Sequence, residues 1–184
     1  MQQSKSSATR RVVMIGLMSA IAVLLSLVPG FSIIPVVSFI KYEYSDLPII
    51  ITALALGTPA GLLTAFISVG ISFLLGIEGG AHWGALQHFI AIGANAAVAG
   101  LIYHFRKTKT GAVIGLSAGI IARTLIMIPA NILITPLYTG APVEAVKGLL
   151  LPGIIPVNFI KSTISAVITF FVYKRLSPLL QGKK

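Results

Sequence analysis

The sequence predicts an all-α integral membrane protein with six transmembrane helices and both termini in the cytoplasm. Of its 184 residues, 56% are hydrophobic and only 10% are charged, whereas soluble domains average about 25% charged residues. The apolar residues form six segments separated by glycine, proline and polar residues. Six spans of roughly 20 residues fill the chain, so we expect a single domain over residues 1–184 with cytoplasmic tails at 1–11 and 176–184.

The first predicted span covers residues 12–28. Its polar, basic start resembles a signal peptide, but the long apolar run and the spans that follow favour an uncleaved helix. Gly16 and Ala20 are four residues apart, which allows another helix to approach closely. This pair serves either a contact between subunits or ordinary internal packing.

A long connection over residues 31–46 follows Pro29-Gly30 and contains the densest polar and aromatic cluster, at 41–46. It is either an interfacial loop with an aromatic belt or a lid over a binding site. Asp46 precedes Leu47-Pro48 and fits a helix N-cap. The second span, 47–56, is short because Gly57-Thr58-Pro59 interrupts it, and the third covers 60–75.

The fourth and fifth spans carry polar residues. We place the fourth at residues 84–104, with Gln87 near its start, and the fifth at 111–134. Arg123 lies near the middle of the fifth span, where it either points into a cavity or, as we favour, has a structural role. Pro129 is expected to kink this helix. A loop with a short amphipathic turn near 144–151 leads to the last span.

The last span, residues 153–173, contains Asn158 and Lys161. Because they are three residues apart, they project from nearly the same face of a helix. A lysine at the centre of a span costs about 2.5–3.5 kcal/mol on insertion scales. We therefore expect Lys161 to face a cavity or a partner, although a lysine can also extend its ammonium group to the lipid headgroups.

The charged residues divide between the two sides of the predicted bundle. In a six-span topology one side holds only basic residues, and the opposite side holds all four carboxylates with Lys41 and Lys147. The positive-inside rule places the basic side, and with it both termini, in the cytoplasm. The net charge of +10 therefore indicates membrane topology rather than nucleic-acid binding. The basic residues on that side are Lys5, Arg10, Arg11, Arg106, Lys107, Lys109, Lys174, Arg175, Lys183 and Lys184.

Polar groups from several segments fall at one depth in this topology. Asn131 lies near the outer end of the fifth span, Asn158 lies in the outer part of the sixth, and Lys161 lies somewhat deeper. The 41–46 cluster is on the same outer side. Such convergence of a few polar groups in apolar surroundings predicts a binding pocket for a solute.

Several kinds of chemistry are missing from the sequence. It has no phosphate-binding loop and no cysteine, and its three histidines do not have metal-ligand spacing. All four carboxylates fall in predicted external connections, which leaves none inside the membrane for a proton relay. We therefore expect no enzyme activity, no metal and no cofactor, but a binding protein that needs another protein for energy.

Three stretches resemble a known family: KYEYSDLP at residues 41–48, IPANILITPLY at 128–138 and IPVNFIK at 155–161. They resemble the riboflavin-specific substrate-binding (S) components of energy-coupling factor (ECF) transporters, the RibU type. This resemblance implies a six-helix protein of a prokaryotic plasma membrane that captures riboflavin from outside, with FMN as a second ligand. It also implies two kinds of partner, a transmembrane coupling subunit and two ATPase subunits.

The resemblance also implies roles for individual residues. Asn131, Asn158 and Lys161 would contact the polar edge of the flavin ring, where an amide offers one acceptor and two donors. Gly16 and Ala20 would face the coupling subunit. The expected substrate-binding set further contains Lys41, Tyr42, Asp46, Gln87 and Phe39, and the aromatic candidates for the dimethylbenzene end of the flavin are Phe39, Tyr42, Trp83 and Phe159.

Other functions stay open on the sequence. The chain is alternatively an S component for another planar heterocycle, such as a pyrimidine-like or pterin-like vitamin. A stand-alone channel or secondary carrier and a membrane enzyme are two further hypotheses. The absence of a predicted intramembrane carboxylate disfavours the carrier.

Overall fold

The computed structural model describes residues 2–79 and 81–181, and the side chains of residues 8–79 and 82–176. Lys183 and Lys184, which contributed to the predicted cytoplasmic charge, lie outside the described residues. All regular elements of the described chain are helical: α1 (Gln2–Ser26), η1 (Pro35–Val37), α2 (Asp46–Leu56), α3 (Thr58–Leu74), α4 (Ala81–Phe105), α5 (Lys109–Thr139), α6 (Val143–Gly148), η2 (Leu150–Ile154) and α7 (Ile155–Gln181).

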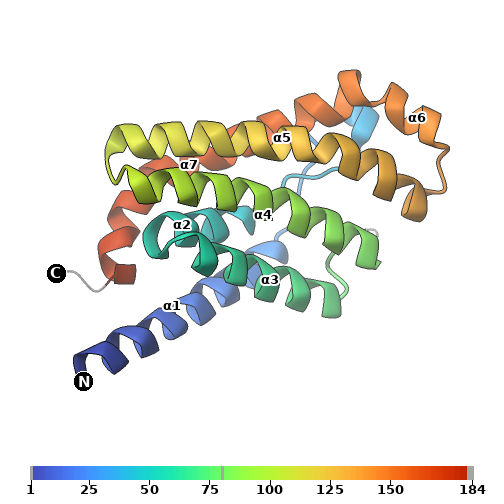
Figure 1. Ribbon diagram of the computed structural model, residues 1–184. Coiled ribbons are helices and arrows are strands. Elements are labelled where there is room, and N and C mark those ends of the chain that lie inside the picture. The colour runs from blue at the N-terminus through green and yellow to red at the C-terminus, as the bar shows by residue number, and fades with distance from the viewer. Residues whose placement is uncertain (1, 80, 182–184) are drawn as a thin grey trace.

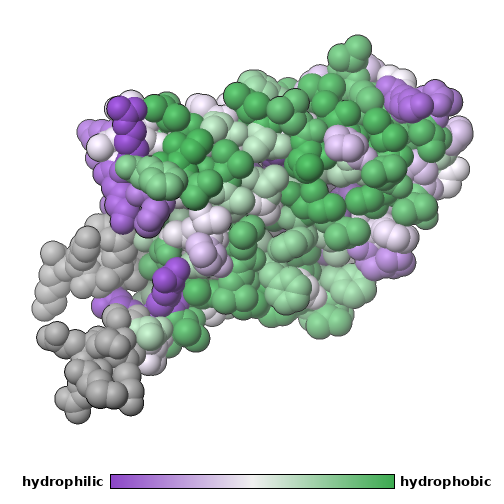
Figure 2. Space-filling model, viewed as in Figure 1, coloured by the Kyte–Doolittle hydropathy of each residue, from purple (hydrophilic) through white to green (hydrophobic). Residues whose placement is uncertain are grey.

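The helices form one elongated bundle (Figure 1). The start of α1, the α2–α3 and α4–α5 junctions and the end of α7 lie at one end, whereas α6 lies at the other. Figure 2 shows hydrophobic side chains along the visible flank of the bundle and hydrophilic ones towards its two ends. This distribution is the one expected of a bundle surrounded by lipid.

Four helical segments are long and apolar enough to cross a membrane: Ala8–Ser26, His82–Phe105, Lys109–Thr139 and Leu150–Leu176. The other two predicted spans form helices that are shorter, α2 with 11 residues and α3 with 17. All residues of α2 except Leu47 and Leu56 are buried, and α2 packs against α1, α3, α4 and α7. A helix surrounded by protein on all sides need not match the thickness of the bilayer.

Two local predictions about helix ends are wrong. Helix α5 continues to Thr139 rather than ending near 134, so that Pro136 lies inside it, and Gly140 ends it with a φ of 70°, which glycine adopts without steric cost. The side chain of Asp46 does not cap α2; the N-cap position is Ser45, without a side-chain hydrogen bond. The Asp46 carboxylate instead contacts residues of α4 and α5.

The connection at residues 31–45, which we call the lid, packs on the bundle instead of extending into solvent. Its short helix η1 buries Val37 completely against Val146, Ile154 and Val157. A Cβ added to Gly153 would lie 2.5 Å from Cγ1 of Val37, so the close approach of η1 to η2 depends on this glycine. A short helix, α6, was predicted near 144–151 and is present at Val143–Gly148.

Candidate functional site

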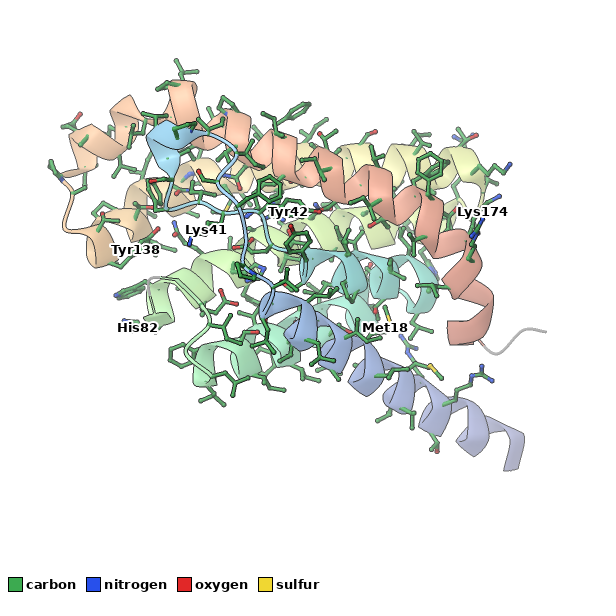
Figure 3. All side chains as sticks on the ribbon, turned by 180° about the vertical axis from the view of Figure 1, so that it is seen from behind. Met18, Lys41, Tyr42, His82, Tyr138 and Lys174 are labelled. Carbon is green, nitrogen blue, oxygen red and sulfur yellow. The ribbon has the colours of Figure 1, made fainter. Side chains whose placement is uncertain are left out.

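A cavity of about 230 Å³ lies beneath the lid. Its walls come from the lid, α4, α5, α7, the end of α1 and the connection between α3 and α4. In Figure 3, Lys41, Tyr42 and Tyr138 lie in one half of the molecule, and Lys174 lies towards the opposite end. Of the eight predicted substrate-binding residues, seven line this cavity: Phe39, Lys41, Tyr42, Gln87, Asn131, Asn158 and Lys161.

Amide and hydroxyl groups of α4 and α5 form one wall of the cavity. Gln87 Nε2 donates to Thr135 Oγ1 at 3.1 Å, and the Tyr138 hydroxyl donates to Gln87 Oε1 at 3.0 Å. Thr135 Oγ1 also donates to Asn131 Oδ1 at 3.0 Å, while Asn131 Nδ2 donates to the Met127 carbonyl. The sequence analysis missed Thr135 and Tyr138. These residues follow Asn131 by four and seven positions and so share its face of the helix. They were missed because the helix was predicted to end at 134.

Lys161 and Asn158 line the cavity from α7. The Lys161 ammonium group is buried and donates to Glu43 Oε2 at 2.5 Å and to the Lys41 carbonyl at 2.7 Å, both on the lid. Asn158 Nδ2 donates to the Ile154 carbonyl at 2.9 Å. Lys161 therefore faces the cavity, as predicted, and does not extend to the headgroups. Its partner carboxylate on the lid was not predicted.

Asp46 lies behind the cavity wall rather than in it. It is completely buried, and its carboxylate accepts a hydrogen bond from Arg123 Nη1 and lies 3.1 Å from His88 Nε2. Arg123 lines the cavity, and its Nη2 is 3.6 Å from Glu43 Oε2. Arg123 therefore lines the cavity and also pairs with Asp46, whereas Asp46, which was expected to bind the substrate, does not line the cavity.

The four acidic residues were predicted to lie in external connections, and the ion pairs that three of them form inside the bundle were not predicted. Glu43, Asp46 and Glu78 all turn inward and meet buried cations. Buried charges need counter-ions, because leaving one unpaired in apolar surroundings costs several kcal/mol. The position of a residue in a connection does not reveal the direction of its side chain. The signal that could have been used is the basic residues inside the spans, Arg123, His88 and Lys161, because each of them needs a carboxylate partner when it is buried.

Two groups of the lid have altered acidity. Burial alone would raise the pKa of the Glu43 carboxyl, but the positive charges of His88 and Lys161 outweigh it and hold this pKa below its ordinary value. Burial raises the pKa of the Tyr42 phenol, which also shares a hydrogen bond with Ser165 Oγ at 3.1 Å. At neutral pH the lid therefore presents a carboxylate and a neutral phenol.

Glu43, Asp46 and His88 also offer three possible metal-ligand atoms within 4.8 Å of one another. Asp46 and Glu43 already pair with Arg123 and Lys161, respectively. A donor set neutralised by protein cations has little attraction left for a metal ion. We therefore interpret this group as part of an ion-pair network.

The aromatic candidates separate into two groups. Phe39 and Tyr42 line the cavity, and Tyr42 stacks on Phe31 with ring centroids 5.5 Å apart. Trp83 and Phe159 do not line it, contrary to prediction. Phe159 is 50% exposed on the outside of α7, and Trp83 packs against the cluster of Ala91, Met127, Ala130 and Ile134. On a helix the residue after Asn158 is rotated about 100° away from it.

Comparison with known proteins places this fold in a family. Residues 10–173 match the family described as "ECF transporter, substrate-specific component". The chain is 26% identical over 183 residues to the riboflavin transporter FmnP of Bacillus subtilis (strain 168), which covers 95% of this chain and 96% of the relative. It is 31% identical over 138 residues to the riboflavin transporter RibU of Lactococcus lactis subsp. cremoris (strain NZ9000), covering 72% of this chain and 66% of that protein.

A solved structure shares the fold. The structure reported as "Structure and mechanism of the S component of a bacterial ECF transporter" superposes with a TM-score of 0.79 at 24% identity, over 94% of this chain and 98% of that one. The family match covers nearly all of the described helices. The chain therefore belongs to the substrate-specific components of ECF transporters, a family of transport proteins and not of enzymes.

Proposed function

We propose that this protein captures riboflavin from the outside of a prokaryotic plasma membrane as the substrate-binding component of an ECF importer. The observation that carries the proposal is the cavity, which is lined by Gln87 of α4 and Asn131 of α5 and by Asn158 and Lys161 of α7. The names of the two relatives, both riboflavin transporters, support the choice of ligand.

The groups around the cavity suit the polar edge of a flavin. That edge alternates carbonyl acceptors with a ring N–H, and asparagine and glutamine amides supply both donors and acceptors. An ammonium group has three donors, of which Lys161 uses two within the protein. The third is available for a flavin carbonyl. Phe39 and Tyr42 supply aromatic surface for the ring, and FMN, which has the same ring, is a second candidate ligand.

The proposal includes a six-span topology with both termini in the cytoplasm. All six predicted spans are helical, and the start of α1 and the end of α7 lie at the same end of the bundle (Figure 1). Arg106 and Lys107 lie in the α4–α5 junction, which is at that end, and Lys109 is the first residue of α5. The positive-inside rule then directs the lid and the cavity to the outside.

The energy for import comes, in this proposal, from partner proteins: a transmembrane coupling subunit and two ATPase subunits. Gly16 and Ala20 are exposed on the outer face of α1, and no other part of the described chain lies within 4 Å of a Cβ placed at Gly16. A surface of small residues lets a neighbouring helix approach closely. This face is our candidate for the contact with the coupling subunit.

Titration of riboflavin fluorescence with the purified protein in lipid nanodiscs tests the proposal. We expect quenching with a sub-micromolar Kd, and we expect pyrimidine and pterin compounds to compete poorly. A Kd for riboflavin in the millimolar range would refute the proposed ligand. Riboflavin uptake into liposomes that contain this protein alone, without an ATPase, would instead support the stand-alone carrier.

A further inference from the structure

His88, near the start of α4, has a carboxylate at each of its two ring nitrogens. Nδ1 lies 3.0 Å and 3.2 Å from the two carboxylate oxygens of Glu78, and Nε2 lies 3.1 Å from Asp46 Oδ1. Glu43 Oε2 is also within 3.8 Å of Nε2. The side chain of His88 is only 3% exposed, so water does not replace these contacts.

This geometry determines the charge of the ring. A neutral imidazole has one N–H donor and one bare nitrogen that can only accept a hydrogen bond, and an ionised carboxylate also only accepts. Two carboxylates at opposite nitrogens can both be satisfied only by the imidazolium form, in which both nitrogens donate. His88 is therefore a buried cation.

The charges of the network balance when His88 is protonated. Three carboxylates, of Glu43, Asp46 and Glu78, then meet three cations, of His88, Arg123 and Lys161. With a neutral His88 the same buried group would carry a net negative charge, which apolar surroundings disfavour. The protonated ring is thus required for neutrality as well as for hydrogen bonding.

The three carboxylates around His88 come from three separate segments. Glu43 belongs to the lid, Asp46 is the first residue of α2, and Glu78 lies in the connection between α3 and α4. Glu43 and Glu78 also line the cavity, as does His88. A cation at this point therefore connects the lid and the α3–α4 connection to helix α4 at the edge of the cavity.

We infer that His88 is a positioning residue for ligand binding: a permanently protonated imidazole that holds the lid and the α3–α4 connection in place around the cavity. The effect on riboflavin affinity rests on the function proposed above, whereas the charge of the ring does not. His88 acts through Glu43 and Glu78, and its loss lowers affinity by loosening these segments.

The charge is measured first, in a protein close to the natural one. The chain has three histidines, and His82 and His104 are exposed, so the double variant His82→Gln/His104→Gln leaves His88 as the single histidine. The protein is labelled with ¹⁵N-histidine in lipid bilayers, and its ring nitrogens are observed by NMR at about pH 8, where an ordinary imidazole is largely neutral. We expect two protonated nitrogens. A ring with one bare nitrogen would overturn the inference.

The positioning role is measured by riboflavin titration. His88→Gln should weaken binding about tenfold or more, because Glu78 loses its cation, and it should increase amide hydrogen exchange in the lid and in residues 75–79. His82→Gln, on the same helix, is the matched control and should change neither. Unchanged affinity of a folded His88→Gln protein would overturn the role.

A second substitution separates charge pairing from general damage to the fold. Glu78→Gln removes the carboxylate that His88→Gln leaves unpaired, so the double variant should recover part of the lost affinity. If the losses of binding free energy in the two single variants simply add in the double variant, the inference is contradicted. If the wild-type protein fails to bind riboflavin while the NMR experiment shows an imidazolium, the proposed function is refuted and the charge of His88 stands.

Discussion

At the scale of single residues, the site depends on cations that are already paired before a ligand arrives. Lys161 donates to Glu43 and to the lid backbone, and Arg123 binds Asp46. Such pairs orient a side chain, so that little conformational entropy remains to be lost on binding. The same pairing means that removal of one partner leaves an uncompensated buried charge, which is strongly destabilising.

Removal of Asn158 or Lys161 tests the polar wall on α7. We expect Asn158→Ala and Lys161→Ala each to weaken riboflavin binding by about 1–3 kcal/mol in fluorescence titrations, because a polar group of the ligand loses its partner. Lys161→Ala should also increase hydrogen exchange in the lid, since Glu43 loses its cation, whereas Asn158→Ala should not.

Phe159 provides the control for this pair, because it lies between the two residues in sequence but is half exposed on the outside of α7. Phe159→Ala should leave the affinity nearly unchanged. Folded Asn158→Ala and Lys161→Ala proteins with wild-type affinity would place the binding site elsewhere.

The lid carboxylate Glu43 predicts an acid limit for binding. Its pKa lies below the ordinary value because the positive charges of His88 and Lys161 outweigh burial, which alone would raise it. A carboxylate with a pKa lowered by folding stabilises the folded lid fully above the ordinary value of about 4.3, and this contribution disappears as the pH falls through the lower folded value. We expect the riboflavin Kd to be constant from about pH 7 to pH 5 and to rise below about pH 4.

Glu43→Gln is the control for this profile. It should bind more weakly at neutral pH, because Lys161 loses its counter-ion, and it should show a smaller loss in acid. A wild-type Kd that already rises between about pH 7 and pH 6 would contradict the assignment of the acid limit to this group.

At the scale of elements, the sequence predicts the helices well and the lid poorly. Helix positions follow from local patterns, because an apolar run bounded by glycine, proline or charge forms a helix whatever its neighbours. The lid is held by contacts distant in sequence, such as Tyr42 with Ser165 and Val37 with Gly153. The direction of its side chains depends on those contacts. The pairing of Glu43 and Asp46 with buried cations was therefore not predicted, although Asp46 was expected in the substrate-binding set.

Residues that follow a helical repeat could be placed in the site from sequence alone. Asn158 and Lys161 share a face of one helix, and the structure shows both of them on the cavity wall. Phe159 could not be a third member of that face, because consecutive residues point in different directions. The short length of α2 could not be explained from the sequence, because 11 residues suffice only where nearly all of them are buried among other helices.

The contact between η1 and η2 predicts how the lid is closed. Gly153→Ala would place a methyl group 2.5 Å from Cγ1 of the fully buried Val37, so η1 must move outward. We expect weaker riboflavin binding, mainly through faster dissociation in stopped-flow fluorescence, because the lid no longer closes completely. Gly148→Ala is the matched control, since nothing in the described structure lies within 4 Å of its added Cβ. Equal dissociation rates for the two variants would rule out this closing contact.

At the scale of the whole molecule, the proposed binding site and the proposed contact with the coupling subunit lie on different surfaces. The cavity lies under the lid, among the ends of several helices. Gly16 and Ala20 lie on the outer face of α1, next to the exposed Leu17 and Val13. Such a separation lets one protein hold its ligand tightly and still expose an unobstructed helix to a partner in the membrane. The two activities should then respond to different mutations.

Gly16→Leu tests that separation. The added side chain meets no other part of the described chain within 4 Å of its Cβ, so the isolated protein should fold and bind riboflavin with unchanged Kd. The same side chain would hold a neighbouring helix away from α1, so co-purification with the coupling subunit and ATPases, and ATP-dependent uptake into liposomes, should fall at least tenfold. Ser117→Leu, at an exposed small residue of α5, should impair neither.

If Gly16→Leu assembles and transports normally, the partner contacts a different face, whereas a loss of riboflavin binding would mean that the small residues of α1 serve internal packing.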